Sequence, residues 1–414
     1  MLALIIPQKQ DVFDESRWRG AGISATMIGV RDDIALYVHI PFCQRKCNYC
    51  SFVSYDCRHA DIPAYLKALE TEMAQRSKGE SVSSIYFGGG TPSLLSAEQV
   101  SDVLKTIYSL FAVGKTVEIT IEANPGTVNE AYLEAIRGLG VNRLSLGVQS
   151  LNDDELNVLG RIHTAADAMR AAECVRSTGF DNLNLDLIYG LPGQRLSGWQ
   201  KTLEKAIALR PEHLSLYGLT LEEETPLWRT IEAGALPAID GDLSAEQYEL
   251  AEDLLAAEGY RHYEISNWAK EGYQCRHNLV YWQNLAYLGV GVAAHSCLNG
   301  HRLANTGDID KYLATFASGL PFLPEMDEEI SPELELAETV ILALRLDEGI
   351  DVAKISNRYN IDVLSYYERQ IREVVEAGLL ETGEGHLKLT RRGRLLSNEV
   401  FWRLLPDEAG VKIS

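Results

Sequence analysis

The segment HIPFCQRKCNYCSF, residues 39–52, places three cysteines at a C-x3-C-x2-C spacing directly after a run of β-branched and aromatic residues. The cysteines are Cys43, Cys47 and Cys50, and the pattern stops short of a fourth. A structural zinc site would need a fourth ligand, for which His39, Cys57 and His59 are the candidates. A 4Fe-4S cluster on three thiolates would instead keep one iron free for a small molecule. The spacing alone leaves both centres open.

Similar short runs recur along the chain and predict strands. They read IALYVHI, SIYFGGG, VEITIEA, NRLSLGV, LNLDLIYG and HLSLYGL, at residues 34–40, 84–90, 117–123, 142–148, 183–190 and 213–219. Helical patterns separate them, and two of those patterns end on glycines of the kind that follow helices. Strands that alternate with helices predict an α/β fold with a parallel sheet.

Residues with distinctive chemistry stand at or just after the carboxyl end of nearly every predicted strand. Examples are Cys43, Gly88, Glu122, Gln149 and Tyr217. A doubly wound sheet would gather such residues near one switch point, whereas a β/α barrel collects them from many strands at one mouth. We therefore predict a partial, six-stranded β/α barrel that is open on one side.

Composition limits the partners and the compartment. A formal net charge of −21 over 414 residues argues against a nucleic-acid partner, because phosphate groups would be repelled. The chain has seven cysteines, and four of them lie between residues 43 and 57. This clustering favours metal ligands in a reducing compartment over disulfides. No apolar run is long enough to span a membrane, and the opening MLALII lacks the features of a signal peptide. We therefore predict a cytoplasmic protein.

The three-cysteine loop after the first strand of such a barrel resembles the radical S-adenosylmethionine (SAM) superfamily. The resemblance implies a 4Fe-4S cluster on Cys43, Cys47 and Cys50 whose free iron binds SAM, the source of a 5′-deoxyadenosyl radical. It also assigns YFGGGTP to the amino group of SAM and Glu122 to the ribose hydroxyls. The positions that resemble SAM contacts are Tyr37, Tyr49, Gly89, Gly90, Thr91, Glu122, Gln149, Arg161, Asp186 and Thr220.

A narrower resemblance covers about residues 35 to 320. Its motifs are YVHIPFCQRKCNYC, YFGGGTPSLL, EANPGT, RLSLGVQSLNDDELNVLGRIH, DLIYGLPGQ and YEISNWA. They are similar to the oxygen-independent coproporphyrinogen oxidase group, which holds the coproporphyrinogen III dehydrogenases and the HemW heme chaperones. The dehydrogenases usually carry a cysteine where this chain has Phe52, and HemW proteins carry an HNxxYW motif, present here at residues 277–282. Both features favour the chaperones.

The HNxxYW motif predicts a heme site. His277 offers a neutral imidazole, which is a common axial ligand of heme iron, and Tyr281 and Trp282 offer aromatic faces to a porphyrin. Cys275 is a second candidate ligand. The sequence leaves open which of the two binds iron, whether the attachment is covalent, and whether SAM is cleaved.

Two functions from different classes follow from the resemblance. A heme chaperone would pass heme to apo-hemoproteins, with membrane-bound respiratory subunits among the candidate acceptors. A coproporphyrinogen III dehydrogenase would use the radical to convert propionate side chains into vinyl groups and carbon dioxide. The motifs favour the chaperone and leave open whether the chain forms a homodimer.

The remaining segments predict the domain organisation. Residues 1–33 are expected to form a disordered N-terminal extension, residues 34–325 the barrel with a HemW-type extension, and residues 326–414 a winged-helix-like α+β domain. GVGVAA, residues 289–294, matches a dinucleotide-binding fingerprint. It lacks a convincing helix start, so we interpret it as a chance match.

Overall fold

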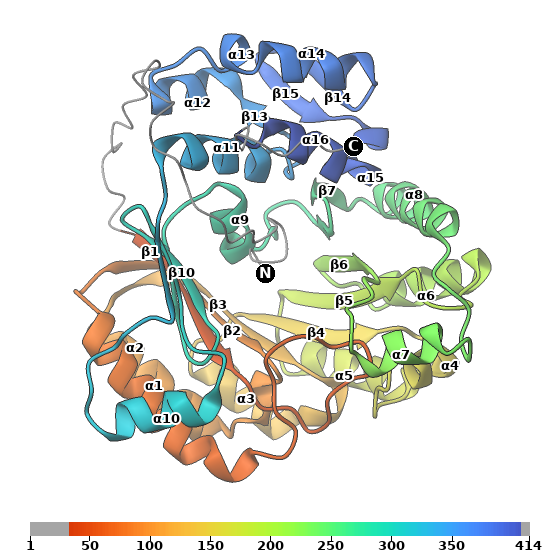
Figure 1. The fold of residues 1–414 in the computed structure, drawn as a ribbon. Coiled ribbons are helices and arrows are strands. Elements are labelled where there is room, and N and C mark those ends of the chain that lie inside the picture. The colour runs from red at the N-terminus through yellow and green to blue at the C-terminus, as the bar shows by residue number, and fades with distance from the viewer. Residues whose placement is uncertain (1–32, 407–414) are drawn as a thin grey trace.

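The computed structural model describes residues 33–406, and six parallel strands form its centre (Figure 1). They are β1 (Asp33–Ile40), β2 (Ser81–Gly89), β3 (Ala112–Ala123), β4 (Arg143–Gln149), β5 (Leu183–Tyr189) and β6 (His213–Gly218). Each pairs in parallel with the next one along the chain. All six predicted strands are therefore confirmed. The predicted N-terminal extension lies outside the described residues, apart from Asp33, which begins β1.

The sheet is larger than the predicted six strands. Within residues 33–406 it has twelve, in the order β12-β11-β10-β9-β1-β2-β3-β4-β5-β6-β8-β7. The added strands are β7 (Arg261–Glu264), β8 (Asn267–Ala269), β9 (Tyr287–Val290), β10 (His295–Leu298), β11 (His301–Ala304) and β12 (Met326–Glu329). β9 lies parallel to β1, and β8 runs antiparallel to β6. The predicted number is wrong because strands of three or four residues are too short to show a periodic pattern.

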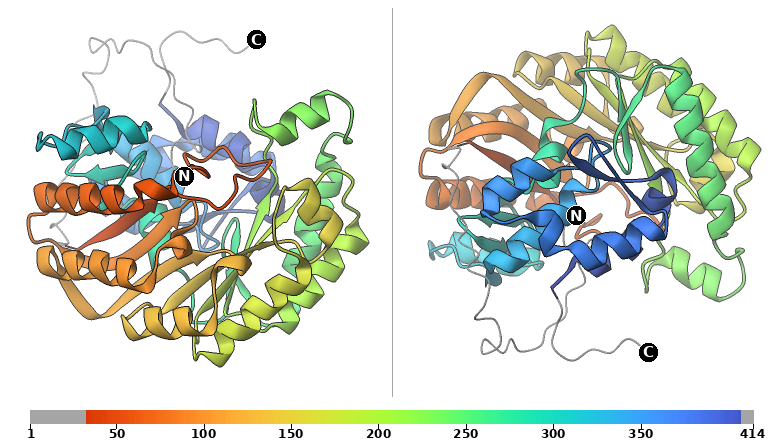
Figure 2. Two further views of the ribbon diagram at one scale, coloured as in Figure 1. Left: turned by 90° about the horizontal axis from the view of Figure 1, so that it is seen from below. Right: turned by 90° about the horizontal axis from the view of Figure 1, so that it is seen from above.

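Helices cover the outer side of the curved sheet (Figure 2). They are α1 (Ile62–Arg76), α2 (Ala97–Leu110), α3 (Glu130–Gly138), α4 (Asp153–Val158), α5 (Ala165–Ser177), α6 (Leu196–Ala208) and α8 (Gly241–Ala257). The short helix α7 (Pro226–Glu232) instead projects away from the sheet after β6. Successive strand residues point to opposite faces, so Leu144 and Leu146 join the apolar core under the helices. Their neighbours Arg143, Ser145 and Gly147 point the other way. We call this second side of β1–β6 the inner face.

The C-terminal part of the chain has an apolar core of its own. Its elements are α11 (Pro332–Ala343), β13 (Ile350–Asp351), α12 (Val352–Tyr359), α13 (Val363–Tyr366), α14 (Glu368–Glu376), β14 (Leu380–Gly383), β15 (His386–Leu389), α15 (Arg391–Leu395) and α16 (Ser397–Leu404). Arg394 ties it to the barrel through an ion pair with Glu252 of α8 (2.8 Å). Helices and a hairpin are present as predicted, while the comparison with a winged helix stays a prediction. No helix between residues 33 and 406 is long and apolar enough to cross a membrane.

One buried carboxylate joins the added strands to the barrel. Glu72 of α1 pairs with Arg76 (2.8 Å) and accepts hydrogen bonds from Tyr312 (2.7 Å), Asn305 (2.8 Å) and the backbone N–H of Gly291 (2.8 Å). Gly291 belongs to GVGVAA, which leads from β9 through a turn into antiparallel β10 rather than into a helix. The interpretation of this motif as a chance match is therefore confirmed.

Gly291 predicts a sharp cost for an added methyl group. Its φ is +103°, and a Cβ atom would lie 2.4 Å from Tyr65 Oη and 2.8 Å from the carbonyl oxygen of His39. We expect Gly291→Ala to lower the free energy of unfolding by about 2 to 4 kcal/mol in urea titrations. Gly300→Ala is the matched control, because φ there is +79° with no atom within 4 Å, and it should cost about 1 kcal/mol. Equal losses in the two variants would contradict the close contact.

Candidate cofactor site

The three cysteines lie in the loop after β1, which crosses the barrel at the carboxyl ends of the strands (Figure 2, left). Cys43 is buried, and the other two thiols are partly exposed. Asn48, at the centre of the loop, donates its backbone N–H to Leu159 (3.0 Å) and accepts from the N–H of Leu227 (2.8 Å). The loop is therefore fixed to segments that follow β4 and β6.

A chain of hydrogen bonds joins two of the thiols. Thr91 Oγ1 donates to Cys43 Sγ (3.7 Å), and Arg161 Nη1 donates to Cys47 Sγ (3.3 Å). Asn124 links the two donors, because its amide nitrogen donates to Thr91 Oγ1 (2.9 Å) and its amide oxygen accepts from Arg161. We call these five residues the thiol arc. Asn124 stands in the EANPGT motif but is not among the residues predicted to bind a cofactor.

The side chains that could complete a zinc site do not join the cysteines. His39 hydrogen-bonds to the carbonyl of Val53 (3.1 Å), His59 to that of Cys43 (2.8 Å), and Cys57 is exposed. In the described part of the chain, no three His, Cys, Asp or Glu side chains converge on one metal position. The thiolates of an iron-sulfur cluster bind different iron atoms and so stand farther apart than the ligands of one ion. The donor set fits a 4Fe-4S cluster better than zinc.

Two glycines let the end of β2 approach the loop. Gly89 has φ +114°, and a Cβ atom there would lie 2.6 Å from the His39 ring. A Cβ atom on Gly90 would lie 2.7 Å from the carbonyl oxygen of Phe42 and 3.0 Å from Cys43 Sγ. Glycine is therefore required for packing here, and it keeps the space beside the thiols free of side chains.

Two carboxylates lie on the inner face near these glycines. Glu122 accepts from Tyr86 Oη (2.9 Å) and from the N–H of Gly89 (3.1 Å), while Asp186 accepts from Ser145 Oγ (2.9 Å). Burial, aided by the charge of Asp186, raises the pKa of Glu122 to about 7. Burial raises the pKa of Asp186 as well. The charge of this region therefore changes near neutral pH.

The other residues that resemble SAM contacts are spread around the mouth. Tyr37 stacks on Tyr86 with ring centroids 6.2 Å apart, and Tyr49 packs beside an apolar cluster that includes Ile188. Gln149 ends β4 with φ +65°, a conformation that is strained for a residue with a side chain. Thr220 is exposed in the loop after β6.

The HNxxYW motif is divided between two surroundings. His277, on α9 (Arg276–Trp282), is 1% exposed, and its ring nitrogens hydrogen-bond to Ser84 Oγ (2.9 Å) and Tyr281 Oη (3.0 Å). Burial lowers the pKa of His277 to about 3, so the imidazole is neutral. Trp282 instead packs against Arg345, which lies 4.6 Å from its ring centroid. Iron bound at His277 Nε2 would therefore have to displace the hydroxyl of Tyr281 from this nitrogen.

Cys275, the second candidate for heme, is fully buried. Its Sγ lies 3.6 Å from Glu118 Oε1. Burial raises the pKa of Cys275 to about 12, which keeps the sulfur protonated, whereas metal ligation needs the thiolate. The raised pKa therefore disfavours Cys275 as a metal ligand.

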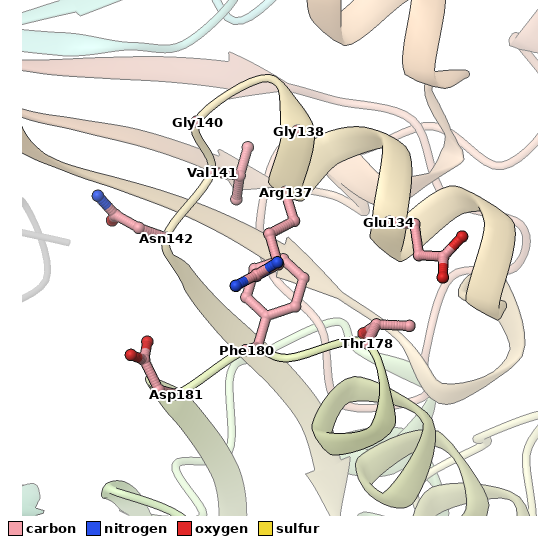
Figure 3. A pocket seen from close by; sticks show the side chains of 9 residues that line it. All are labelled: Glu134, Arg137, Gly138, Gly140, Val141, Asn142, Thr178, Phe180 and Asp181. Atoms are coloured by element: carbon pink, nitrogen blue, oxygen red, sulfur yellow. The ribbon is translucent and has the colours of Figure 1, made fainter.

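Two surface pockets are lined by other residues. The first, of about 540 Å³, is lined by Glu134, Arg137, Gly138, Gly140, Val141, Asn142, Thr178, Phe180 and Asp181, before β4 and β5 (Figure 3). The second, of about 470 Å³, includes Gln44 of the cysteine loop, together with His163 and Cys174. Neither pocket is lined by a residue that the sequence assigned to a cofactor.

Comparisons with known proteins agree with this geometry. The model of the radical SAM superfamily matches residues 37–206, and that of the HemN C-terminal domain matches residues 330–396. The solved structure of the radical SAM enzyme coproporphyrinogen III oxidase (HemN) from Escherichia coli gives a TM-score of 0.79 at 25% identity, over 90% of each chain. Fold and cysteine loop thus define a radical SAM protein.

Relatives of known name narrow the class. The heme chaperone HemW of Bacillus subtilis is 35% identical over 376 residues, which cover 90% of this chain and 99% of its own length. The radical S-adenosyl methionine domain-containing protein 1 of mouse mitochondria is 42% identical, with coverages of 90% and 87%. The chain belongs to the HemW family.

Glu122 predicts a pH-dependent stability. The carboxyl of Glu122 has a pKa of about 7 in the folded protein and 4.5 in the unfolded chain, so its protonated form stabilises the folded state. This stabilisation is fully present below pH 4.5 and is lost as the pH rises to 7. The loss is about 3 kcal/mol. Between pH 4.5 and 8, wild type should therefore lose about that much stability relative to Glu122→Gln in urea titrations. The same change at exposed Glu134 is the control, and a pH-independent difference at Glu122 would contradict the prediction.

Proposed function

We propose that this protein is a heme chaperone, which binds heme and transfers it to apo-hemoproteins while carrying a 4Fe-4S cluster and SAM. The observation that carries the proposal is the similarity to Bacillus subtilis HemW over almost the whole of both chains. Phe52, at the position where the dehydrogenases usually have a further cysteine, agrees with it.

Cys43, Cys47 and Cys50 hold the cluster in this proposal. The thiol arc supports the assignment, because donors on sulfur stabilise thiolates. When bound, SAM supplies a route to a 5′-deoxyadenosyl radical. The residues proposed to hold SAM are Tyr37, Tyr49, Gly89, Gly90, Thr91, Glu122, Gln149, Arg161, Asp186 and Thr220.

We assign heme to the inner face at His277. Its neutral imidazole can bind iron through Nε2 once Tyr281 releases that nitrogen. Tyr281 is then free to contact the porphyrin, whereas Trp282 reaches the same site only if α9 moves away from Arg345. Heme loading is therefore proposed to include a rearrangement of α9.

A coproporphyrinogen III dehydrogenase is the second candidate. The similarity of the fold to HemN over 90% of each chain favours it. Its reaction needs a porphyrinogen as substrate and SAM as a consumed reagent, whereas a chaperone returns its heme unchanged. The two functions therefore differ in whether the tetrapyrrole is altered.

The compartment, the domain division and the partners of the protein are also part of the proposal. All seven cysteines lie in the described part of the chain and none forms a disulfide, which supports a reducing compartment such as the cytoplasm. Separate apolar cores support a division between a barrel at residues 34–325 and a winged-helix-like domain at 326–414, with residues 1–33 as an extension. Acceptors in membrane-bound respiratory complexes, and a homodimer, also stay proposals.

An anaerobic experiment separates the two functions. The reconstituted protein is incubated with hemin in one sample, and with coproporphyrinogen III, SAM and a reductant in another. We expect one heme bound per chain and no protoporphyrinogen. The Cys43→Ala variant should lose its iron and sulfide, which checks the cluster assignment. Conversion of the porphyrinogen would overturn the chaperone and establish the dehydrogenase.

The heme ligand is tested by His277→Ala. Removal of the imidazole should weaken hemin binding about tenfold or more and alter the Soret band, while the iron and sulfide content stays unchanged. His295→Ala is the matched control, since this partly buried histidine lies outside the motif. Unchanged hemin affinity in His277→Ala would shift the assignment to Cys275.

A further inference from the structure

Arg143, the first residue of β4, is one of the largest fully buried side chains of the protein. It is 1% exposed and points to the inner face, since its neighbour Leu144 belongs to the outer core. Its Nε atom has no hydrogen-bond partner among residues 33–406, and its guanidinium lies within 4.0 Å of no carboxylate oxygen there. A buried charge without a partner is strongly destabilising.

The carboxylates of the inner face are satisfied by other donors. Glu118 accepts from the N–H of His277 (3.2 Å), and Asp186 accepts from Ser145 and from Asn184 (both 2.9 Å). Glu122, as described above, accepts from Tyr86 and from a backbone N–H. Among residues 33–406, the positive charge of Arg143 is therefore without a carboxylate partner.

Two other arginines with little solvent exposure show the usual arrangement. Arg76 pairs with Glu72 at 2.8 Å, and Arg302 pairs with Glu338 at 2.6 Å. Burial alone would lower the pKa of Arg143, but negative charge nearby, including that of Glu118, outweighs this effect, and the pKa lies above its ordinary value. The guanidinium therefore stays charged, and unlike Arg76 and Arg302 it has no carboxylate oxygen within 4.0 Å among residues 33–406.

A second unpartnered group lies beside it. Thr120 of β3 is the register partner of Arg143, is fully buried, and its Oγ1 makes no hydrogen bond in the described part of the chain. A guanidinium and a hydroxyl together match the donor pattern that a carboxylate prefers. His277 lies in the same region, because the charge of Arg143 acts on its imidazole.

We infer that Arg143 and Thr120 form an anion site on the inner face, which binds a propionate carboxylate of the tetrapyrrole while His277 holds its iron. The inference rests on the proposed function, and it makes Arg143 a residue that determines specificity for tetrapyrroles with free propionates. A carboxylate could also come from the methionine part of SAM, and the two sources are separated below.

The test uses the full-length protein with its reconstituted cluster and two ligands, hemin and hemin dimethyl ester, in the same detergent-containing buffer. The ester keeps the iron and the ring but removes both negative charges. Wild type should bind hemin about tenfold or more tightly than the ester. This arm needs no variant. If wild type binds neither ligand, the proposed function itself fails, whereas equal affinities overturn only the anion site.

Variants locate the charge that the ester arm detects. Arg143→Met should abolish the preference for hemin over the ester, Arg143→Lys should keep most of it, and Thr120→Val should reduce it in part. Arg137→Met is the matched control, because it removes one positive charge from the exposed pocket of Figure 3 and should keep the full preference.

Two outcomes would overturn the assignment. If Arg143→Met weakens both ligands equally, Arg143 serves only to balance the carboxylates of the inner face. If it weakens SAM binding while the preference for hemin persists, the carboxylate belongs to SAM. Near-ultraviolet circular dichroism and iron content confirm that each variant is folded, and a variant that fails to fold leaves the ester arm and Thr120→Val to decide.

Discussion

Polar side chains that the six parallel strands turn away from the helices must find partners inside the protein. The outer residues of β1–β6 form one continuous apolar core, as parallel strands covered by helices require. The inner residues include Glu118, Glu122, Arg143 and Asp186, whose charges share a region of low solvent access. The raised pKa of Glu122 follows from this enclosure.

The thiol arc shows how the barrel uses the ends of those strands. Its members come from the loop after β1 and from segments that follow β2, β3 and α4, and each alone could occupy many rotamers. Hydrogen bonds through Asn124 fix their relative positions. Preorganisation of this kind costs its entropy during folding rather than when a ligand binds.

Hydrophobic periodicity and local motifs made much of this structure predictable from the sequence. The six strands and the three-cysteine loop were predictable because each is a local pattern. The short strand β9 was not, since it pairs with β1 across about 250 residues. Arg143 gave no signal either, because an arginine that begins a strand is usually exposed, and only burial without a partner distinguishes it. The sequence likewise could not show that Tyr281 occupies the nitrogen of His277.

Helix α9 joins two parts of the molecule in only seven residues. His277, near its start, faces the barrel interior, while Trp282, at its end, stacks on Arg345 of the C-terminal part. A helix this short moves as one body, so a displacement of one end also displaces the other. If a ligand at His277 changes how tightly a second protein binds the C-terminal domain, thermodynamic reciprocity requires that this protein changes the ligand's affinity by the same factor. Where that factor is below one, binding of the second protein promotes release of the ligand at His277.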